Sequence, residues 1–562
     1  MRIRRRGDPA EQSGQGRRSR GGHVPIVVAF SARRPSRERG ISQRLRRDHA
    51  DHRAGTTSCP PSNESARQRP PTTGSRYENR IIGAGVAAVG PLDALARAEG
   101  TPGTITVFEG SAALWRGRTY QRDVPAVRVN APPALMSARA SDRGHFQDWL
   151  ARRPDVVRFL DPGLGQPIVP RAMYGDYLEQ SARASIDRLR RDGCQVSVVN
   201  DRVTDVAGEQ PVVLRTEGGV LYPVDRVVLC VGSGRPRDQY GLTGSPGYLD
   251  EPYPLVRTIT EVDPEAHVAV IGSGLTAVDI TAALTENGHR GPITLLSRSG
   301  ILPFVQQRPR PLAPRHLIPA AALDLAAGGP VEFTAVVALL RAELADLGED
   351  FDEFAAEIRA TGAEDPVLRL RRQLADVDSA LLGRRLLTMA IRTMGPILWP
   401  AMTDADRRML RTDHYRTISS LSSPMVPHNA EILLRLLNSG QVRLRTGLTA
   451  IAVDDIGFTM TDESVWTADI VINAVNPPAY VTPQDTESLM ARLLGSGTAE
   501  FAPTGGLRAE PHTRALHAGT WHVLGNLAAD SMFIATNPPG LAAEAALLAE
   551  HLTKESGLPV DI

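Results

Sequence analysis

The chain has 562 residues, of which 42% are hydrophobic and 23% are charged, a balance typical of a soluble globular protein with roughly two to four domains. No apolar run is long enough to cross a bilayer, and the net charge of +1 is close to neutral. Cys59, Cys194 and Cys230 are too few and too scattered for a disulfide framework or a metal site, and the absence of a C-x-x-C pair excludes the thiol–disulfide reductases. We therefore expect a cytoplasmic protein without a metal.

Residues 1–75 differ from the rest in charge. They contain 17 Arg against 6 acidic residues, whereas the remainder carries 47 basic and 57 acidic residues. A basic arm of this kind is compatible with binding to nucleic acid or to a membrane surface. However, Lys554 is the only lysine, so Arg is abundant throughout the chain, and the arm is rich in Gly, Pro and Ser without any period. We predict a disordered arm, with neither nucleic acid nor membrane as a partner.

After the arm, the sequence predicts a strand that turns sharply into a helix. Residues 79–88 read N-R-I-I-G-A-G-V-A-A, and the G-x-G-x-x-A spacing aims the N-terminus of a helix at a pyrophosphate. The next strand, 104–109, ends in a carboxylate suited to an adenosine ribose hydroxyl. We predict an FAD site at this point, formed by Gly83, Ala84, Gly85, Val86, Ala87 and Glu109.

The segment 115–150 has few periodic residues and places Asn130 and Met136 in a Pro-rich stretch. A loop in this position commonly runs along a flavin, and a plain surface loop is the other interpretation; the residues alone leave both open. A helix is predicted from Arg171 to about Arg191, followed by strands up to 231. The last of these is a buried parallel strand, and we expect the chain to cross from one dinucleotide-binding unit to the other at Gly232.

A second strand–turn–helix unit begins at 268, in the sequence V-A-V-I-G-S-G-L-T-A-V-D-I. It repeats the G-x-G-x-x-A spacing, and two chance Gly-rich turns, each followed by a suitable strand, are much less probable than one. The following strand, 292–298, ends in Ser-Arg-Ser instead of an acid, which favours a 2′-phosphate. We predict an NADPH site at Gly272, Ser273, Gly274, Leu275, Thr276 and Arg298.

From 315 to 412 the periodicity is helical almost without strands, which predicts an inserted subdomain that covers the active site. Strand character returns at 442–458 and 470–476, and a closing strand ends at Gly525 and Asn526, before a helix that starts near Pro538. The predicted fold is α/β, with two Rossmann-like dinucleotide-binding domains and an inserted helical subdomain. Its predicted parts are a disordered arm (1–75), an FAD-binding domain (76–240 and 481–562), an NADPH-binding domain (265–310 and 431–480) and the helical subdomain (311–430).

This order of motifs, over about 78–556, resembles the flavoproteins with two dinucleotide-binding domains. Several pieces are similar to bacterial FAD/NAD(P)-binding proteins that include actinobacterial amino-acid N-oxygenases of the nitrosuccinate synthase kind. These pieces are Val129-Asn130 with Met136-Ser137, Pro170-Arg171 with Tyr174-Gly175, Val270 to Asp279, and Gly288 to Pro292. The sequence departs from many relatives at Gly525-Asn526, where they carry Gly-Asp.

The resemblance implies that NADPH reduces FAD, and that a C4a-(hydro)peroxyflavin formed with O2 hydroxylates the nitrogen of a small amino acid or amine in secondary metabolism or antibiotic biosynthesis. Oxidation of aspartate to nitrosuccinate is one member's chemistry. The alternatives are a flavin reductase or dehydrogenase without oxygen insertion, and a non-enzymatic protein that senses NADPH. The sequence indicates no general base and no oligomeric state. An anionic substrate would need hydrogen-bond donors on the helical cover. The candidates are His414, Tyr415, Arg416, Arg308 and Arg310. The simpler interpretation is that these are surface residues of an Arg-rich chain.

Overall fold

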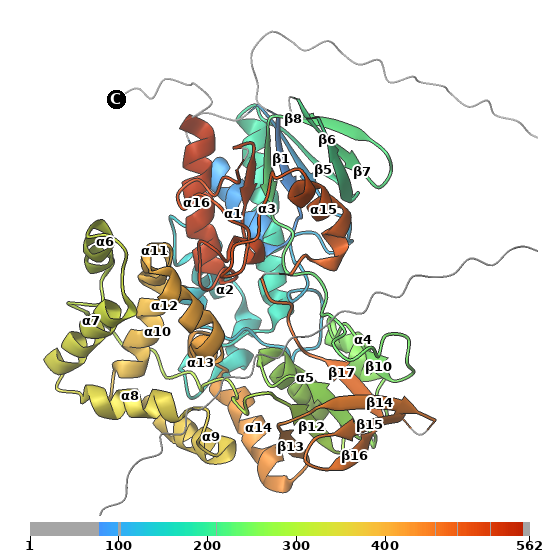
Figure 1. The fold of residues 1–562 in the computed structure, drawn as a ribbon, viewed down its shortest axis with the longest axis vertical. Helices are drawn as coiled ribbons and strands as arrows, with labels where there is room; N and C mark the ends of the chain where they lie inside the picture. Colours follow the sequence, from blue (N-terminus) through green and yellow to red (C-terminus); the bar gives the residue numbers. More distant parts are fainter. Residues whose placement is uncertain are drawn as a thin grey trace, which may run out of the picture. The chain divides into compact units, whose positions relative to one another are not determined.

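Figure 1 shows the fold as a computed structural model. The structure describes residues 78–98, 103–208, 211–455, 457–479, 481–517 and 519–554. The predicted disordered arm, 1–75, lies outside the described residues.

The first sheet has five parallel strands in the order β18-β9-β1-β2-β5. The apolar runs of β18, β9, β1 and β2 are buried on both faces, as expected for parallel strands covered on two sides, whereas the edge strand β5 is partly exposed. On one face α1 packs between α3 and α16, and on the other an antiparallel sheet and α15 complete the core. The elements are β1 (Glu78–Ile82), α1 (Val86–Leu95), β2 (Thr104–Phe108), α3 (Arg171–Arg191), β5 (Gln195–Val199), β6 (Val203–Ala207), β7 (Val212–Thr216), β8 (Leu221–Val224), β9 (Arg226–Leu229), α15 (Glu487–Gly495), β18 (Trp521–Val523) and α16 (Pro538–Lys554).

The second sheet repeats this plan, with five parallel strands in the order β10-β17-β11-β12-β13. Helices α4, α5 and α14 share its core on one face, and a three-stranded antiparallel sheet packs on the other. The elements are β10 (Tyr248–Leu249), α4 (Leu255–Thr260), β11 (Val268–Ile271), α5 (Leu275–Glu286), β12 (Ile293–Leu296), α14 (Pro427–Ser439), β13 (Val442–Arg445), β14 (Ala450–Asp454), β15 (Gly457–Thr461), β16 (Val465–Ala468) and β17 (Ile470–Asn473).

Between β12 and α14 the chain is helical, and these helices gather together, coloured yellow to orange in Figure 1. They have a core of their own around Leu344, Leu386 and Trp399. The elements are α6 (Pro319–Ala327), α7 (Phe333–Asp346), α8 (Phe351–Ala360), α9 (Pro366–Ala375), α10 (Gly383–Thr393), α11 (Gly395–Ala401), α12 (Asp404–Met409), a π-helical turn (Leu410–His414) and α13 (Tyr415–Ser422).

The predicted fold class is confirmed: the chain is α/β with two Rossmann-like parallel sheets and a helical segment between strands of the second. The structure adds detail at the edges of the predicted parts. The second sheet also contains β10, and α4 covers it, both from the stretch 241–264 that the predicted division leaves unassigned. The remaining short elements are α2 (His145–Ala151), β3 (Leu160–Asp161) and β4 (Gln166–Pro167).

Candidate active site

The first glycine-rich turn joins β1 to α1 and leaves no room for a side chain at Gly83. Gly83 has φ +95°, and a Cβ there would lie 2.5 Å from the carbonyl oxygen of Cys230. Gly85 is the N-cap of α1, so the first N–H groups of the helix stay free of side-chain caps. The carboxylate of Glu109 lies beside the turn, where it accepts hydrogen bonds from the N–H of Ala84 (2.8 Å) and of Ser111 (2.9 Å).

The second turn joins β11 to α5 in the same way, with Gly272 at φ +128° and Gly274 as the N-cap of α5. The hydroxyl of Ser273 lies 2.8 Å from Ser297 Oγ and 3.0 Å from the carbonyl oxygen of Ile301. These contacts fasten the loop after β12 to the turn. Arg298 belongs to that loop, and its side chain is exposed.

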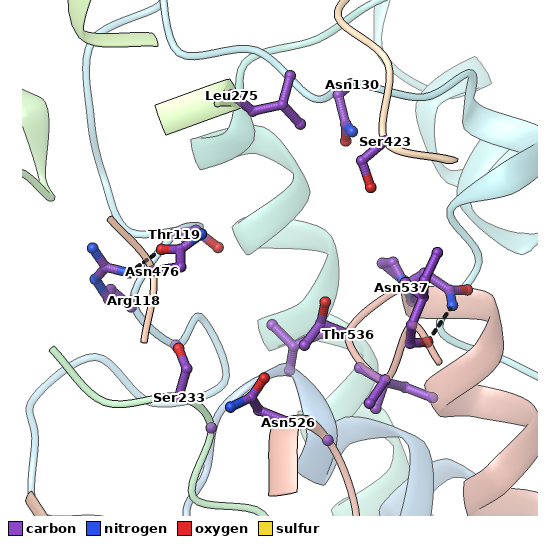
Figure 2. Close-up of a pocket in the computed structure, with 18 of the residues that line it drawn as sticks. Arg118, Thr119, Asn130, Ser233, Leu275, Ser423, Asn476, Asn526, Thr536 and Asn537 are labelled. Carbon is purple, nitrogen blue, oxygen red and sulfur yellow. Dashed lines mark hydrogen bonds between the residues drawn. The ribbon is translucent and has the colours of Figure 1, made fainter. Parts of the chain in front are cut away.

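Both turns open into one continuous cavity of about 3470 Å³. Figure 2 shows side chains from separate segments around this space: Asn130 and Leu275 in one region, Asn526, Thr536 and Asn537 in another. The structure thus brings the predicted FAD and NADPH residues to a common cavity, with the exception of Ala84, which is fully buried and outside the lining. The predicted cofactor residues in the lining are Gly83, Gly85, Val86, Ala87, Glu109, Asn130, Met136, Gly232, Gly272, Ser273, Gly274, Leu275, Thr276, Arg298, Gly525 and Asn526.

The loop after β18 brings a tightly packed glycine and a buried polar side chain to the cavity. Gly525 has φ +84°, and a Cβ there would come within 3.3 Å of the Cβ of Ala87 in α1. The side-chain nitrogen of Asn526 is buried and has no hydrogen-bond partner, although the residue lines the cavity. A buried donor without a partner is costly, so a ligand acceptor at this position fits the structure.

The start of α16 is tied down by Asn537, a cavity residue that the sequence interpretation did not single out. Its side-chain oxygen accepts a hydrogen bond of 2.8 Å from the N–H of Gly540. The predicted helix start near Pro538 is confirmed, and its N-terminal residues line the cavity. The positive end of the helix therefore faces the space between the turns.

A buried ion pair joins α3, which packs against the first sheet, to α5, which packs against the second. Arg171 begins α3, and its Nη1 lies 2.8 Å from Oδ2 of Asp279 in α5. The hydroxyl of Tyr253 accepts from Arg171 (2.9 Å) and donates to Asp279 (2.6 Å). Burial acts to lower the pKa of Arg171, but Asp279 and Tyr253 outweigh it, so the pKa is raised and the guanidinium stays charged. The sequence signal was Asp279, an acid in the interior of the apolar helix 275–286, whose other acid, Glu286, is its last residue.

The helical segment contributes cations that the sequence interpretation missed. Arg384, Thr388 and Arg392 follow one another at four-residue spacing on α10, and all line the cavity. Arg392 donates to the carbonyl oxygen of Ser422 (3.0 Å), and burial lowers its pKa. Burial also lowers the pKa of Arg384, whose nearest ion-pair partner, Asp376, is 3.6 Å away. These guanidiniums are suited to a substrate anion.

The predicted substrate residues are distributed differently from expectation. His414 is exposed at the end of the π-helical turn and outside the cavity lining, so we no longer assign it to the site. Arg308 is also outside the lining; it pairs with Asp378 and donates to the carbonyl oxygen of Pro162. Tyr415 and Arg310 line the cavity, but Arg310 is paired with Asp378 at 3.1 Å. Arg416 lines it too and contacts the second turn.

No group of three or more His, Cys, Asp and Glu side chains in the described ranges is placed to hold a metal ion. None of the described helices combines the length and apolarity that a bilayer-spanning helix needs.

Comparison with known families gives a match over residues 80–234, to a family described as FAD-NAD(P)-binding. The match begins in β1, contains the first glycine-rich turn and ends just after Gly232. Residues 80–234 form an FAD/NAD(P)-binding domain. A search of curated proteins gave no match.

Solved structures similar to this chain include amine hydroxylases. The cadaverine monooxygenase of desferrioxamine biosynthesis from Erwinia amylovora, bound to FAD, has 13% identity and a TM-score of 0.53, over 87% of this chain and 97% of its own. The reduced ornithine hydroxylase from Pseudomonas aeruginosa has 14% identity and a TM-score of 0.52, over 85% and 99%. The ornithine N-hydroxylase from Kutzneria sp. 744, with reduced FAD, NADP⁺ and L-ornithine, has 14% identity and a TM-score of 0.50, over 86% and 100%.

At these identities the similarity establishes the fold. Almost the whole length of each hydroxylase and 85% to 87% of this chain are covered, so the shared fold extends beyond residues 80–234. Its cofactors are accordingly FAD and NAD(P).

Proposed function

We propose that this protein is an FAD-dependent monooxygenase that consumes NADPH and hydroxylates the nitrogen of a small amino acid or amine. The observation that carries the proposal is the single cavity that both glycine-rich turns line, since hydride transfer requires nicotinamide and flavin to meet. The fold similarity to ornithine and cadaverine hydroxylases supports it. We also propose that the predicted division into FAD-binding, NADPH-binding and helical parts holds, and that the protein acts in the cytoplasm.

The chain's own residues have defined tasks in this scheme. Glu109 would bind an adenosine ribose hydroxyl of FAD, and the free side-chain nitrogen of Asn526 would donate to a flavin carbonyl. Gly274 and the N-terminus of α5 would hold the pyrophosphate of NADPH, with Arg298 at its 2′-phosphate. The chemistry that FAD supplies when bound is hydride acceptance from NADPH and transfer of one oxygen atom of O2 to an amine, the other leaving as water.

The cations on α10 favour an amino acid over a simple amine as substrate. A substrate carboxylate would compensate the buried positive charge of Arg392. Arg384 and Thr388 lie on the same face of α10 and could bind the same group. Aspartate fits this cationic lining and is the specific substrate we propose. Its conversion to nitrosuccinate in antibiotic biosynthesis would take three rounds of the oxygen transfer, from amine through hydroxylamine and nitroso to nitro, and each round would consume one NADPH and one O2.

The test uses the purified full chain with FAD. We expect NADPH oxidation that depends on O2 and on an amino acid, and a hydroxylamine or nitroso product detected by mass spectrometry. When the amino acid is omitted, the O2 that is consumed should appear as hydrogen peroxide. NADPH oxidation that proceeds equally well without O2, with an artificial electron acceptor and no oxidised amine, would instead identify a reductase.

A further inference from the structure

Arg416 extends from α13 in the helical segment to the second glycine-rich turn. Its Nη2 donates to the carbonyl oxygens of Ile301 (2.6 Å) and Ser273 (3.0 Å), and lies 3.3 Å from Ser273 Oγ. Its Nη1 lies 3.6 Å from the position of a Cβ at Gly274. Gly274 is the residue whose missing side chain lets a phosphate approach the start of α5. The second terminal nitrogen of Arg416 is therefore placed above the predicted pyrophosphate position.

The charge around Arg416 is positive. Burial lowers the pKa of its guanidinium; Tyr415 acts in the opposite direction, and the neighbouring Arg298 adds to the effect of burial. Arg369, whose Nη2 donates to the carbonyl oxygen of Leu302, is a third nearby cation, and burial lowers its pKa to about 10. Within the described residues, no carboxylate forms an ion pair with Arg416, and the partners of its Nη2 are neutral oxygens. A bound anion would compensate the positive charges that Arg416, Arg298 and Arg369 bring together here.

The same helical stretch is fastened to the segment that follows Asn526. Arg411, five residues before Arg416, donates to the carbonyl oxygens of Ala529 (2.9 Å) and Phe533 (3.0 Å). Arg407 pairs with Asp530 at 2.5 Å. The π-helical turn Leu410–His414 separates Arg407 from Arg416, and such turns are frequent at functional sites. The stretch 404–422 thus connects the flavin side of the cavity with the second glycine-rich turn.

We infer that Arg416 is a ligand of the NADPH pyrophosphate, supplied to the nucleotide site by the helical segment, while Arg298 binds the 2′-phosphate. This inference rests on the proposed function, because it assigns the second turn to NADPH. The pyrophosphate and the 2′-phosphate would thus be bound by two arginines from different parts of the fold. Arg416 consequently contributes to the binding of any dinucleotide, and Arg298 to the preference for NADPH.

Isothermal titration of the FAD-loaded full chain with NADP⁺ and with NAD⁺ tests the assignment without relying on turnover. Because a charged hydrogen bond is lost, Arg416→Gln should weaken both ligands by a similar factor, about 10- to 100-fold. Arg298→Gln should weaken NADP⁺ alone. Arg408→Gln serves as the matched control, because Arg408 is exposed on the same stretch and lies outside the cavity lining; it should bind both ligands like the wild type.

A salt titration separates a direct phosphate contact from a role in holding the turn. Loss of a phosphate contact makes binding less sensitive to salt, whereas a disturbed turn lowers affinity at every salt concentration alike. Arg416→Lys, which keeps the charge, should recover part of the affinity and covers the case that Arg416→Gln does not fold. Unchanged NADP⁺ and NAD⁺ affinity in Arg416→Gln, a loss confined to NADP⁺, or an unchanged salt dependence would each overturn the inference. Failure of the proposed function gives a different result: a wild type that binds NADP⁺ but yields no oxidised amine.

Discussion

The buried pair Arg171–Asp279 offers the sharpest test of how the two units are held together. Asp279 is 1% exposed, Arg171 8% and Tyr253 5%. The change Asp279→Asn keeps the shape of the side chain but leaves the Arg171 charge buried without a counter-charge. Removal of one partner of a buried ion pair costs about 3–5 kcal/mol, because the remaining charge keeps its desolvation penalty. We expect the free energy of unfolding to fall by this amount for the transition that separates α3 from α5.

Urea unfolding of the full chain, followed by tryptophan fluorescence and by flavin release, measures this loss. The matched control is Glu265→Gln, which removes the partner of Arg290 in an exposed pair of 68% and 63% side-chain exposure. An exposed pair contributes little, so the control should move the unfolding midpoint very little. The double change Arg171→Met with Asp279→Leu should recover most of the stability, since an apolar pair of similar size carries no buried charge. An Asp279→Asn midpoint that matches that of Glu265→Gln would refute the reasoning.

Four further predictions concern cofactor, substrate and pH. Gly83→Ala places a Cβ against the carbonyl oxygen of Cys230, and we expect purified protein with little FAD by its visible spectrum. Arg298→Gln should raise the KM for NADPH about 10-fold but leave that for NADH unchanged, as steady-state kinetics would show. Arg392→Leu should raise the KM for an acidic amino acid about 10- to 100-fold, with a smaller effect on an uncharged amine. The ion pair with Arg445 and a hydrogen bond from Trp466 hold the pKa of Asp462 well below its ordinary value. The stabilisation is therefore present above the unfolded-state pKa of about 3.9 and is lost as the pH falls through the folded-state pKa, so thermal midpoints of Asp462→Asn and wild type should differ at neutral pH and converge in strong acid.

The parts of the fold that depend on local sequence were predictable. Each glycine-rich turn follows a buried apolar strand and precedes a helix, and the structure has these elements at β1–α1 and β11–α5. The start of α16 at Pro538 and the helix from Arg171 to Arg191 were also predicted, because caps and periodicity act over a few residues. The predicted α/β fold class follows from these two strand–turn–helix units.

The cationic part of the site depends on tertiary packing, which a residue pattern does not reveal. The sequence offers Arg416 as one candidate for contact with an anionic substrate or as a surface residue, and it does not reveal that the side chain reaches Ser273 in the second turn. His414 ends the π-helical turn with its side chain exposed and outside the cavity lining, a position that the sequence pattern does not reveal. Arg384 and Arg392 had a usable signal, the four-residue spacing with Thr388, but an Arg-rich chain offers many such spacings.

The central claim is that nicotinamide and flavin meet in the one cavity between the turns. Anaerobic stopped-flow mixing of the FAD-loaded protein with NADPH tests it most directly, because the visible absorbance of oxidised flavin disappears on reduction. The account predicts rapid loss of this absorbance with NADPH, and its return when O2 is admitted. A flavin that stays oxidised under saturating NADPH, in a protein shown by titration to bind NADP⁺, would contradict it.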